Sequence, residues 1–184
     1  MAPADRTRRV FLIGFMGAGK TTVGRALALR LGSTFCDLDD VIEAREGASI
    51  AAIFAERGEA AFRQAESAAL DALLAEGGGQ DRIVALGGGA FVQPQNRDAL
   101  ERAGAITVLL EAPLEELRRR CRADVESRVR PLAQQEDRFA GLFAERRPAY
   151  QLAQHRVQTL GKNVEEVAAE IERIIAVRPP EVKK

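Results

Sequence analysis

The sequence predicts an α/β fold in which helices cover both faces of a parallel sheet. Two observations predict it. Short apolar segments alternate with amphipathic helical segments along the whole chain. A glycine-rich loop also stands between the first apolar segment and the first helical one. Because 184 residues suffice for one domain with small inserts, we expect a single domain over residues 1–184.

Each expected strand is a short, mostly apolar run, and the strands lie near 9–13, 34–38, 82–86, 105–110 and 156–159. The expected helices lie near 20–31, 40–46, 50–57, 59–76, 95–103, 113–122, 135–145 and 164–176. Pro148 follows Arg146 and Arg147 and predicts a sharp helix stop there. The polar stretch 122–134 interrupts the alternation, as a mobile lid would.

Composition excludes several classes of function. Lys and Arg number 27 against 27 Asp and Glu, so nothing points to nucleic acid. No apolar run is long enough to span a bilayer, and residues 1–9 lack the apolar centre of a signal peptide. We therefore expect a cytoplasmic protein without a membrane partner, in which Cys36 and Cys121 are free thiols. His155 is the only histidine, which argues against a His-dependent triad or metal site.

Residues 14–22 match the pattern G-x-x-x-x-G-K-[ST] directly after the apolar run 10–13. The glycines let consecutive backbone N–H groups point at phosphate oxygens, and the following helix adds its positive N-terminus. Lys20, the only lysine before Lys162, reaches the β- and γ-phosphates. A chance glycine-rich turn is the alternative, but the strand–loop–helix context argues against it. The expected nucleotide-binding residues here are Gly17, Ala18, Gly19, Lys20, Thr21 and Thr22.

Two carboxylates end the second expected strand. Alternation along a strand places Asp37 and Asp39 on the same side, at the edge of the sheet where ligands bind in open α/β folds. The alternative is helix capping, in which Asp39 or Asp40 caps the helix that follows. Capping explains one Asp only, so a functional pair is favoured. In the phosphate loop, the Thr21 hydroxyl can ligate Mg²⁺.

Glycines 87, 88 and 89 directly follow the third expected strand. Gly87, Gly88 and Gly89 allow the backbone to approach a ligand closely, with a flexible connection as the alternative. Arg63 alone would be an ordinary surface arginine. Arg130, in the expected lid, could neutralise a phosphoryl group during transfer.

Taken together, these segments resemble the shikimate kinase family, a small member of the nucleoside-monophosphate-kinase group of P-loop proteins. The resemblance runs from about residue 10 to 177. The matching segments are Gly-Phe-Met-Gly-Ala-Gly-Lys-Thr-Thr-Val-Gly, Phe-Cys-Asp-Leu-Asp-Asp-Val-Ile-Glu, Gly-Glu-Ala-Ala-Phe-Arg, Leu-Gly-Gly-Gly-Ala, Arg-Pro-Leu and Arg-Arg-Pro-Ala-Tyr, in this order.

The resemblance implies a three-layer P-loop kinase fold with a five-stranded parallel sheet of order 2-3-1-4-5. It also implies a core over 8–38, 67–121 and 135–177, a small substrate-binding insert over 39–66, and a lid over 122–134. The implied reaction moves the γ-phosphoryl group of ATP to the 3-hydroxyl of shikimate. The products would be 3-phosphoshikimate and ADP, within chorismate and aromatic amino-acid biosynthesis.

Site roles follow from the resemblance as well. Asp39 would hold the shikimate hydroxyls and is the candidate base, Arg63 and Arg146 would bind the carboxylate, and Gly88 would bind a hydroxyl. The guanidinium group of an arginine can form two hydrogen bonds to a carboxylate, and an aspartate accepts hydrogen bonds from hydroxyl groups. Shikimate is then the expected small-molecule partner of a monomer.

The resemblance also assigns the nucleotide side. Lys20 and Arg130 would serve the transferring phosphoryl group, and Asp37 would reach Mg²⁺ through water beside Thr21. The remaining two residues, Arg120 and Lys162, would lie near adenine.

Three other functions share the phosphate loop. A GTPase needs D-x-x-G and N-K-x-D segments, and neither is present. A kinase of gluconate or of a nucleoside monophosphate is the closer alternative, and a substrate screen separates it. A non-enzymatic ATP-binding module is the third, and turnover with ATP, Mg²⁺ and shikimate excludes it.

Overall fold

Strands and helices alternate as the sequence predicts. The computed structural model describes residues 8–76, 81–123 and 136–176. The strands are β1 (Arg9–Ile13), β2 (Thr34–Asp37), β3 (Arg82–Ala85), β4 (Ile106–Glu111) and β5 (His155–Gln158). The helices are α1 (Lys20–Leu31), α2 (Leu38–Glu46), α3 (Ile50–Ala75), the 3-10 helix η1 (Ala90–Val92), α4 (Pro94–Arg102), α5 (Leu114–Ala123), α6 (Glu136–Tyr150) and α7 (Val164–Ala176). Apart from the end of α6, the bounds lie within about two residues of the predicted ones.

The five strands form one parallel sheet of order β2-β3-β1-β4-β5, which confirms the expected topology. The central strand β1 pairs on both sides, with Val10 opposite Ile83 in β3 and Ile106 in β4. The side chains of residues 10–13 are at most 1% exposed. An apolar run of this kind suits a strand that is buried on both faces. The loop after β1 therefore emerges at the middle of the sheet's carboxyl edge, where open α/β sheets bind ligands.

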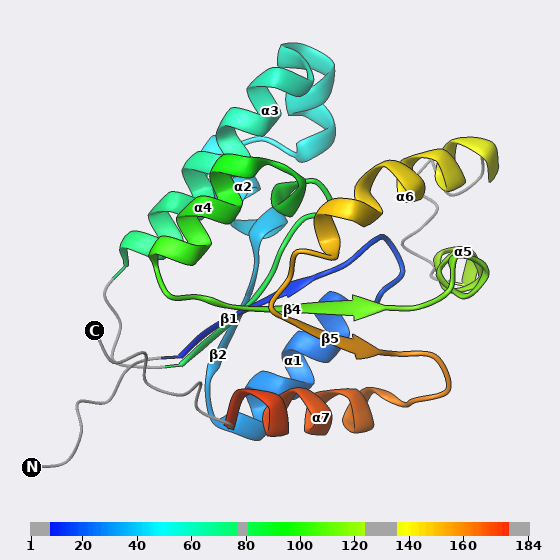
Figure 1. The fold of residues 1–184 in the computed structure, drawn as a ribbon. Helices are drawn as coiled ribbons and strands as arrows, with labels where there is room; N and C mark the ends of the chain where they lie inside the picture. The colour runs from blue at the N-terminus through cyan, green and yellow to red at the C-terminus, as the bar shows by residue number, and fades with distance from the viewer. Residues whose placement is uncertain (1–7, 77–80, 124–135, 177–184) are drawn as a thin grey trace, which may run out of the picture.

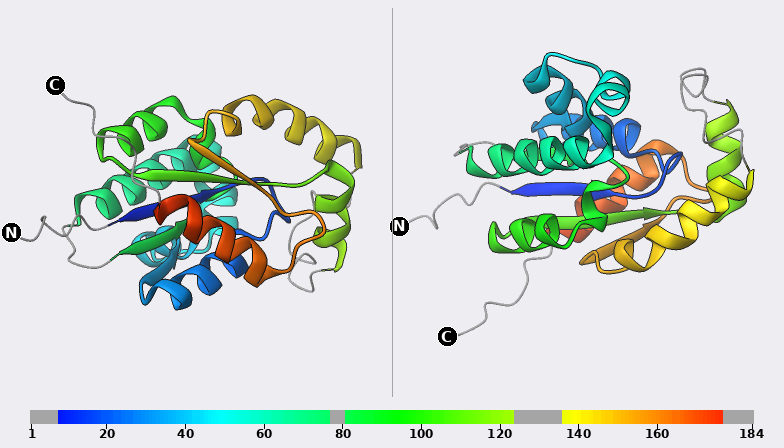
Figure 2. Two further views of the ribbon diagram at one scale, coloured as in Figure 1. Left: turned by 60° about the horizontal axis from the view of Figure 1, so that its bottom comes forward. Right: turned by 90° about the horizontal axis from the view of Figure 1, so that it is seen from above.

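Helices cover both faces of the sheet, which gives the expected three layers. Helices α1 and α7 pack together on one face, and α3 and α4 lie on the other (Figure 1). Leu27 of α1, Ile171 of α7 and Leu70 of α3 are each 0% exposed, so both layers contribute to one apolar core. Helix α5 follows the carboxyl end of β4 and lies away from these covering helices in the views of Figure 1 and Figure 2.

Helix α3 is interrupted at Gly58. This residue has φ 78° and ψ 176°, a backbone conformation that residues other than glycine rarely adopt. The break confirms the two helical segments predicted over 50–57 and 59–76. Across it the rings of Phe54 and Phe62 pack with centroids 4.5 Å apart. Helix α2 and the first half of α3 stand away from the sheet (Figure 1), beside the ends of the strands that carry the site.

Helix α6 continues through the proline at which the sequence predicted a stop, so that prediction is wrong. The helix ends at Tyr150, with Pro148 inside it. An internal proline costs about 3 kcal/mol. However, Tyr150 is 3% exposed, and Phe139 is fully buried with its ring edge-on to Phe15 at 5.0 Å. Burial of each aromatic ring contributes about 1.5–3 kcal/mol, which offsets the cost of the proline. The longer helix places Arg146 and Tyr150 one turn apart.

The expected lid falls mostly outside the described residues. Arg122 and Ala123 end α5, whereas residues 124–134, including Arg130, are not described. No helix in the described part of the chain has the length and apolar character needed to cross a membrane.

Candidate active site

A cavity of about 720 Å³ opens at the carboxyl edge of the sheet. Its walls come from the phosphate loop on one side and from α3, α6 and the segment after β3 on the other. The lining residues near the loop are Met16, Gly17, Gly19, Lys20, Thr21, Thr22, Arg25, Arg120 and Cys121. The others are Asp37, Asp39, Ile50, Phe54, Phe62, Arg63, Glu66, Leu86, Gly87, Gly88, Gly89 and Arg146. The fold therefore brings together thirteen of the predicted site residues and leaves Ala18 and Lys162 out of this lining, whereas Arg130 lies outside the described residues.

The phosphate loop folds as its glycines predict. Gly17 has φ 77°, and a Cβ atom there would lie 2.6 Å from the carbonyl oxygen of Leu117, so only glycine fits. Gly19, with φ 89°, is the N-cap of α1, and no side chain caps this helix end. The first N–H groups of α1 are therefore not used by a capping side chain. An uncapped helix N-terminus at a glycine loop favours an anion such as a phosphate.

The ammonium of Lys20 is held over this loop. Its Nζ donates to the carbonyl oxygens of Gly14 at 2.9 Å and Phe15 at 3.2 Å. Ala18 is 1% exposed, and its N–H donates to the Phe15 carbonyl at 3.2 Å, so this residue braces the loop from inside. The direct nucleotide contact expected for Ala18 stays a prediction.

The acidic pair differs from the prediction in its local structure. Strand β2 ends at Asp37, and this residue, rather than Asp39 or Asp40, is the N-cap of α2. Asp37 Oδ1 accepts from the Asp39 N–H at 3.2 Å, which starts the helix at Leu38. The alternation argument therefore does not apply, because Asp39 already belongs to a helix. Both carboxylates nevertheless line the cavity.

The residues expected to hold magnesium fit that ion. Thr21 Oγ1 donates to Asp37 Oδ2 at 2.8 Å, which joins a hydroxyl and a carboxylate oxygen beside the phosphate loop. Mg²⁺ prefers such oxygen ligands and usually keeps several waters and phosphate oxygens. Among the described residues, no group of three or more His, Cys, Asp or Glu could hold a metal ion by itself. This donor set fits an ion that binds together with a nucleotide.

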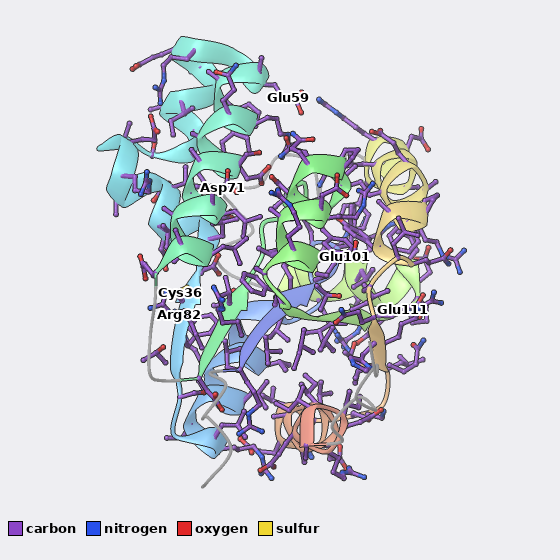
Figure 3. All side chains as sticks on the ribbon, turned by 60° about the vertical axis from the view of Figure 1, so that its left-hand side comes forward. Cys36, Glu59, Asp71, Arg82, Glu101 and Glu111 are labelled. Atoms are coloured by element: carbon purple, nitrogen blue, oxygen red, sulfur yellow. The ribbon has the colours of Figure 1, made fainter. Side chains whose placement is uncertain are left out.

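Arg63 belongs to a partly buried polar network centred on α3. Its Nη1 donates to Glu66 Oε2 at 2.9 Å, and its Nη2 donates to Glu59 Oε1 at 3.2 Å. Glu59 and Asp71 mark the course of α3 in Figure 3. Gln93 Nε2 also donates to Glu66 Oε2, at 2.8 Å. Glu66 is 1% exposed, and its burial raises the pKa of its carboxyl group, which the Arg63 guanidinium opposes.

Sequence reasoning missed Glu66. Its available signal was a glutamate three residues after Arg63, on the same face of an otherwise largely apolar helix. The apolar wall formed by Ile50, Phe54 and Phe62 was missed too, because an apolar residue in a helix predicts core packing first.

The three glycines at 87–89 lie against the charged side chains of the cavity. A Cβ atom would lie 2.7 Å from Asp39 Oδ1 at the first position, 3.1 Å from Arg146 Nη1 at the second and 2.0 Å from Arg63 Nη1 at the third. Each glycine thus makes room for a different polar side chain. The segment brings two guanidinium groups and a carboxylate around one stretch of backbone, as recognition of a small anion with hydroxyl groups requires.

The residues predicted near adenine have separate positions. Arg120 lines the cavity and is held by Thr159, whose Oγ1 and carbonyl oxygen accept at 2.9 and 3.0 Å, and by Glu116 at 2.7 Å. Lys162 is not among the lining residues and donates to Glu170. The adenine contacts of Arg120 and Lys162 stay predictions.

Both cysteines are free thiols, as predicted. Cys36 lies beside Arg82 on the neighbouring strand (Figure 3), and it does not line the cavity. Burial raises the pKa of the Cys36 thiol to about 11, which disfavours the reactive thiolate at neutral pH. Cys121 is buried and lines the cavity beside Gly17.

A phosphate loop on the central strand, an acidic pair beside it and a pocket for a small anion define the class of protein. The fold and site are those of a P-loop kinase that acts on a small molecule.

Comparison with known proteins gives the family. The shikimate kinase family model matches residues 16–176. A shikimate kinase of Geobacter metallireducens is 45% identical over 173 residues, which cover 92% of each chain. A solved shikimate kinase from Acinetobacter baumannii in complex with shikimate is 34% identical, with TM-score 0.83 over 97% of each chain. The chain belongs to the shikimate kinase family.

The alternative substrate has weaker support. A gluconokinase from Sinorhizobium meliloti matches with TM-score 0.63 over 92% of this chain and 91% of its own, at 17% identity. At that identity the likeness shows a shared fold alone.

Proposed function

We propose that this chain transfers the γ-phosphoryl group of ATP to the 3-hydroxyl of shikimate, which gives 3-phosphoshikimate and ADP. This is a step of chorismate and aromatic amino-acid biosynthesis. One observation carries the proposal. The guanidinium groups of Arg63 and Arg146 and the carboxylate of Asp39 surround the glycines at 87–89 in the same cavity as the phosphate loop.

The acceptor is bound by charge and shape in this proposal. Arg63 and Arg146 bind its carboxylate through charge-assisted hydrogen bonds. Asp39 accepts from its hydroxyl groups and orients the one that attacks. The apolar wall of Phe54 and Phe62 covers the carbon ring. Two guanidinium groups and a carboxylate favour a small hydroxy acid over a nucleoside monophosphate as the acceptor.

The donor side positions the phosphates. The N–H groups at the start of α1 and the ammonium of Lys20 bind the phosphate oxygens and stabilise the charge on them during transfer. In this proposal Asp39 takes the proton of the attacking hydroxyl. Thr21 and Asp37 would hold Mg²⁺, which neutralises phosphate charge when it is bound. The Arg130 contribution stays a prediction, as do the monomeric state and the cytoplasmic location.

A substrate screen tests the function. ADP release is measured by a coupled assay with ATP, Mg²⁺ and, in turn, shikimate, gluconate, AMP and CMP. We expect turnover with shikimate, and rates with the others at the level of ATP hydrolysis alone. Lys20→Met is the matched control, because it keeps the loop glycines and removes the ammonium. Equal turnover with gluconate, or no turnover with shikimate, would contradict the proposal.

A further inference from the structure

Tyr150 connects helix α6 to the glycine segment. Its hydroxyl group donates to the carbonyl oxygen of Gly88. Arg146 lies one turn earlier on the same helix, so both side chains emerge on one face. A Cβ atom at Gly88 would lie 3.1 Å from Arg146 Nη1 and 3.7 Å from the Tyr150 hydroxyl oxygen. The guanidinium and the phenol therefore meet at the same glycine.

The three glycines need such a restraint. Without Cβ atoms, consecutive glycines rotate through many backbone conformations at little cost. The carbonyl oxygen of the first glycine accepts from the Ala90 N–H at 3.1 Å, and that of the third accepts from the Val92 N–H at 3.1 Å. The Tyr150 hydroxyl holds the middle carbonyl, so all three are fixed. Because a peptide unit is planar and trans, fixing the Gly88 carbonyl also fixes the direction of the Gly89 N–H.

The environment keeps this donor protonated. Tyr150 is 3% exposed, and its burial raises the pKa of the phenol to about 12, although Arg146 and Arg63 act to lower it. At neutral pH the group is therefore a hydrogen-bond donor. As an uncharged donor it leaves the positive charge of the neighbouring guanidinium groups available for an anion.

We propose that Tyr150 is a positioning residue for the acceptor: its hydroxyl group fixes the Gly88–Gly89 peptide and the Arg146 guanidinium in the arrangement that binds the substrate carboxylate and hydroxyl groups. The inference rests on the proposed function. It makes Tyr150 part of substrate recognition although Tyr150 is not among the residues that line the cavity, and it assigns no role to Tyr150 at the phosphate loop.

Tyr150→Phe tests the inference, because it removes one oxygen atom and keeps the buried ring. The KM values for shikimate and for MgATP are measured separately, together with kcat. Losing one hydrogen bond of this kind predicts a rise of about three- to tenfold in KM for shikimate. We expect kcat to change by less than about twofold, since the reacting groups are untouched. The KM for MgATP should stay unchanged.

Thr107→Val is the matched control. Thr107 is 5% exposed, its hydroxyl accepts from the Gln154 N–H at 3.0 Å, and neither residue lines the cavity. Loss of this hydroxyl group should lower the unfolding temperature and leave the KM values for shikimate and MgATP unchanged. An unchanged KM for shikimate in Tyr150→Phe, or an equal rise in both KM values, overturns the inference. Wild-type enzyme without turnover on shikimate would instead overturn the proposed function, and this inference with it.

A second measurement does not depend on the variant folding. The chain has one tyrosine, so biosynthetic replacement of tyrosine by 3-fluorotyrosine labels position 150 alone. We expect the single fluorine resonance to shift in a saturable manner when shikimate is added, and to stay in place with ADP alone. A resonance that does not respond to shikimate in an active labelled enzyme would overturn the inference.

Discussion

Arg63 Nη1 donates to Glu66 Oε2 at 2.9 Å, and this partly buried ion pair sets the position of a cation beside the glycine segment. The carboxylate of Glu66 is 1% exposed and also accepts from Gln93. A long arginine side chain would otherwise sample many rotamers. The pair therefore orders Arg63 before any substrate arrives, which lowers the entropy cost of binding an anion.

Replacing Arg63 by alanine should weaken substrate binding selectively. Loss of a charge-assisted contact predicts a rise of about ten- to a hundredfold in KM for shikimate, with the KM for MgATP nearly unchanged. Steady-state kinetics with each substrate varied in turn measures both values. Arg57→Ala is the matched control, because Arg57 lies on the same helix and forms an exposed ion pair with Glu46. Equal loss of affinity for ATP would remove Arg63 from the acceptor site.

Substitutions of Asp39 and Asp37 should have different kinetic effects. Asp39→Asn should lose most of its kcat, because the carboxylate orients the attacking hydroxyl and takes its proton. Asp37→Asn should instead require more Mg²⁺ for half-maximal activity. Asparagine caps a helix as well as aspartate does, so the start of α2 should survive this change. Rates measured across a Mg²⁺ titration distinguish the two. An almost silent Asp39→Asn would refute this division of roles.

A methyl group at position 89 should displace Arg63. Gly89 has φ −102°, which alanine adopts without strain, but the added Cβ atom would lie 2.0 Å from Arg63 Nη1. Gly89→Ala should therefore raise the KM for shikimate by about tenfold or more while the fold is kept. Gly141→Ala on α6 is the control, because its Cβ atom would meet no other atom within 4 Å. If both variants give wild-type kinetics, a methyl group at position 89 does not displace Arg63 from the acceptor site.

The phenol of Tyr150 predicts a pH dependence of stability. Its pKa is about 12 in the folded protein and about 10 in an unfolded chain. Folding therefore favours the protonated phenol. The contribution of this phenol to the free energy of unfolding is complete below about pH 10, and it is lost as the pH rises toward 12.

Tyrosinate absorbance and circular dichroism, recorded together in an alkaline titration, measure this effect. The absorbance should remain low at about pH 11 as long as the dichroism is native. Tyr150→Phe should lose this part of the pH dependence. Ionisation near pH 10 in a protein that remains folded would show that the phenol is not buried as described.

The sequence predicted the parallel sheet and the phosphate loop because both depend on local patterns. The run 10–13 is apolar throughout, as a central strand requires, and the glycines at 17 and 19 adopt the positive φ values that their loop needs. The break at Gly58 was predicted for the same reason. The resemblance to a family supplied the strand order, which the structure confirms, and the roles of Arg63 and Arg146, which stay predictions.

What could not be predicted depends on contacts between distant segments. The end of α6 depends on burial of Tyr150 and Phe139, which outweighs the local effect of Pro148. The cap of α2 depends on Asp37, which also accepts from Thr21 sixteen positions away. Glu66 resembles any helical glutamate until the fold buries it beside Arg63. Side chains of this kind gain a function only from their three-dimensional neighbours.

The phosphate loop and the Arg63–Arg146 pair line one continuous cavity rather than two separate pockets. A single inhibitor could therefore join a short phosphate chain to a carboxylate-bearing ring through a linker that crosses the space above Asp39. Once one end is bound, the other end is presented at an effective concentration on the order of millimolar. Such a bisubstrate compound would owe part of its affinity to the pair of guanidinium groups beside the glycine segment, in addition to what the phosphate loop supplies.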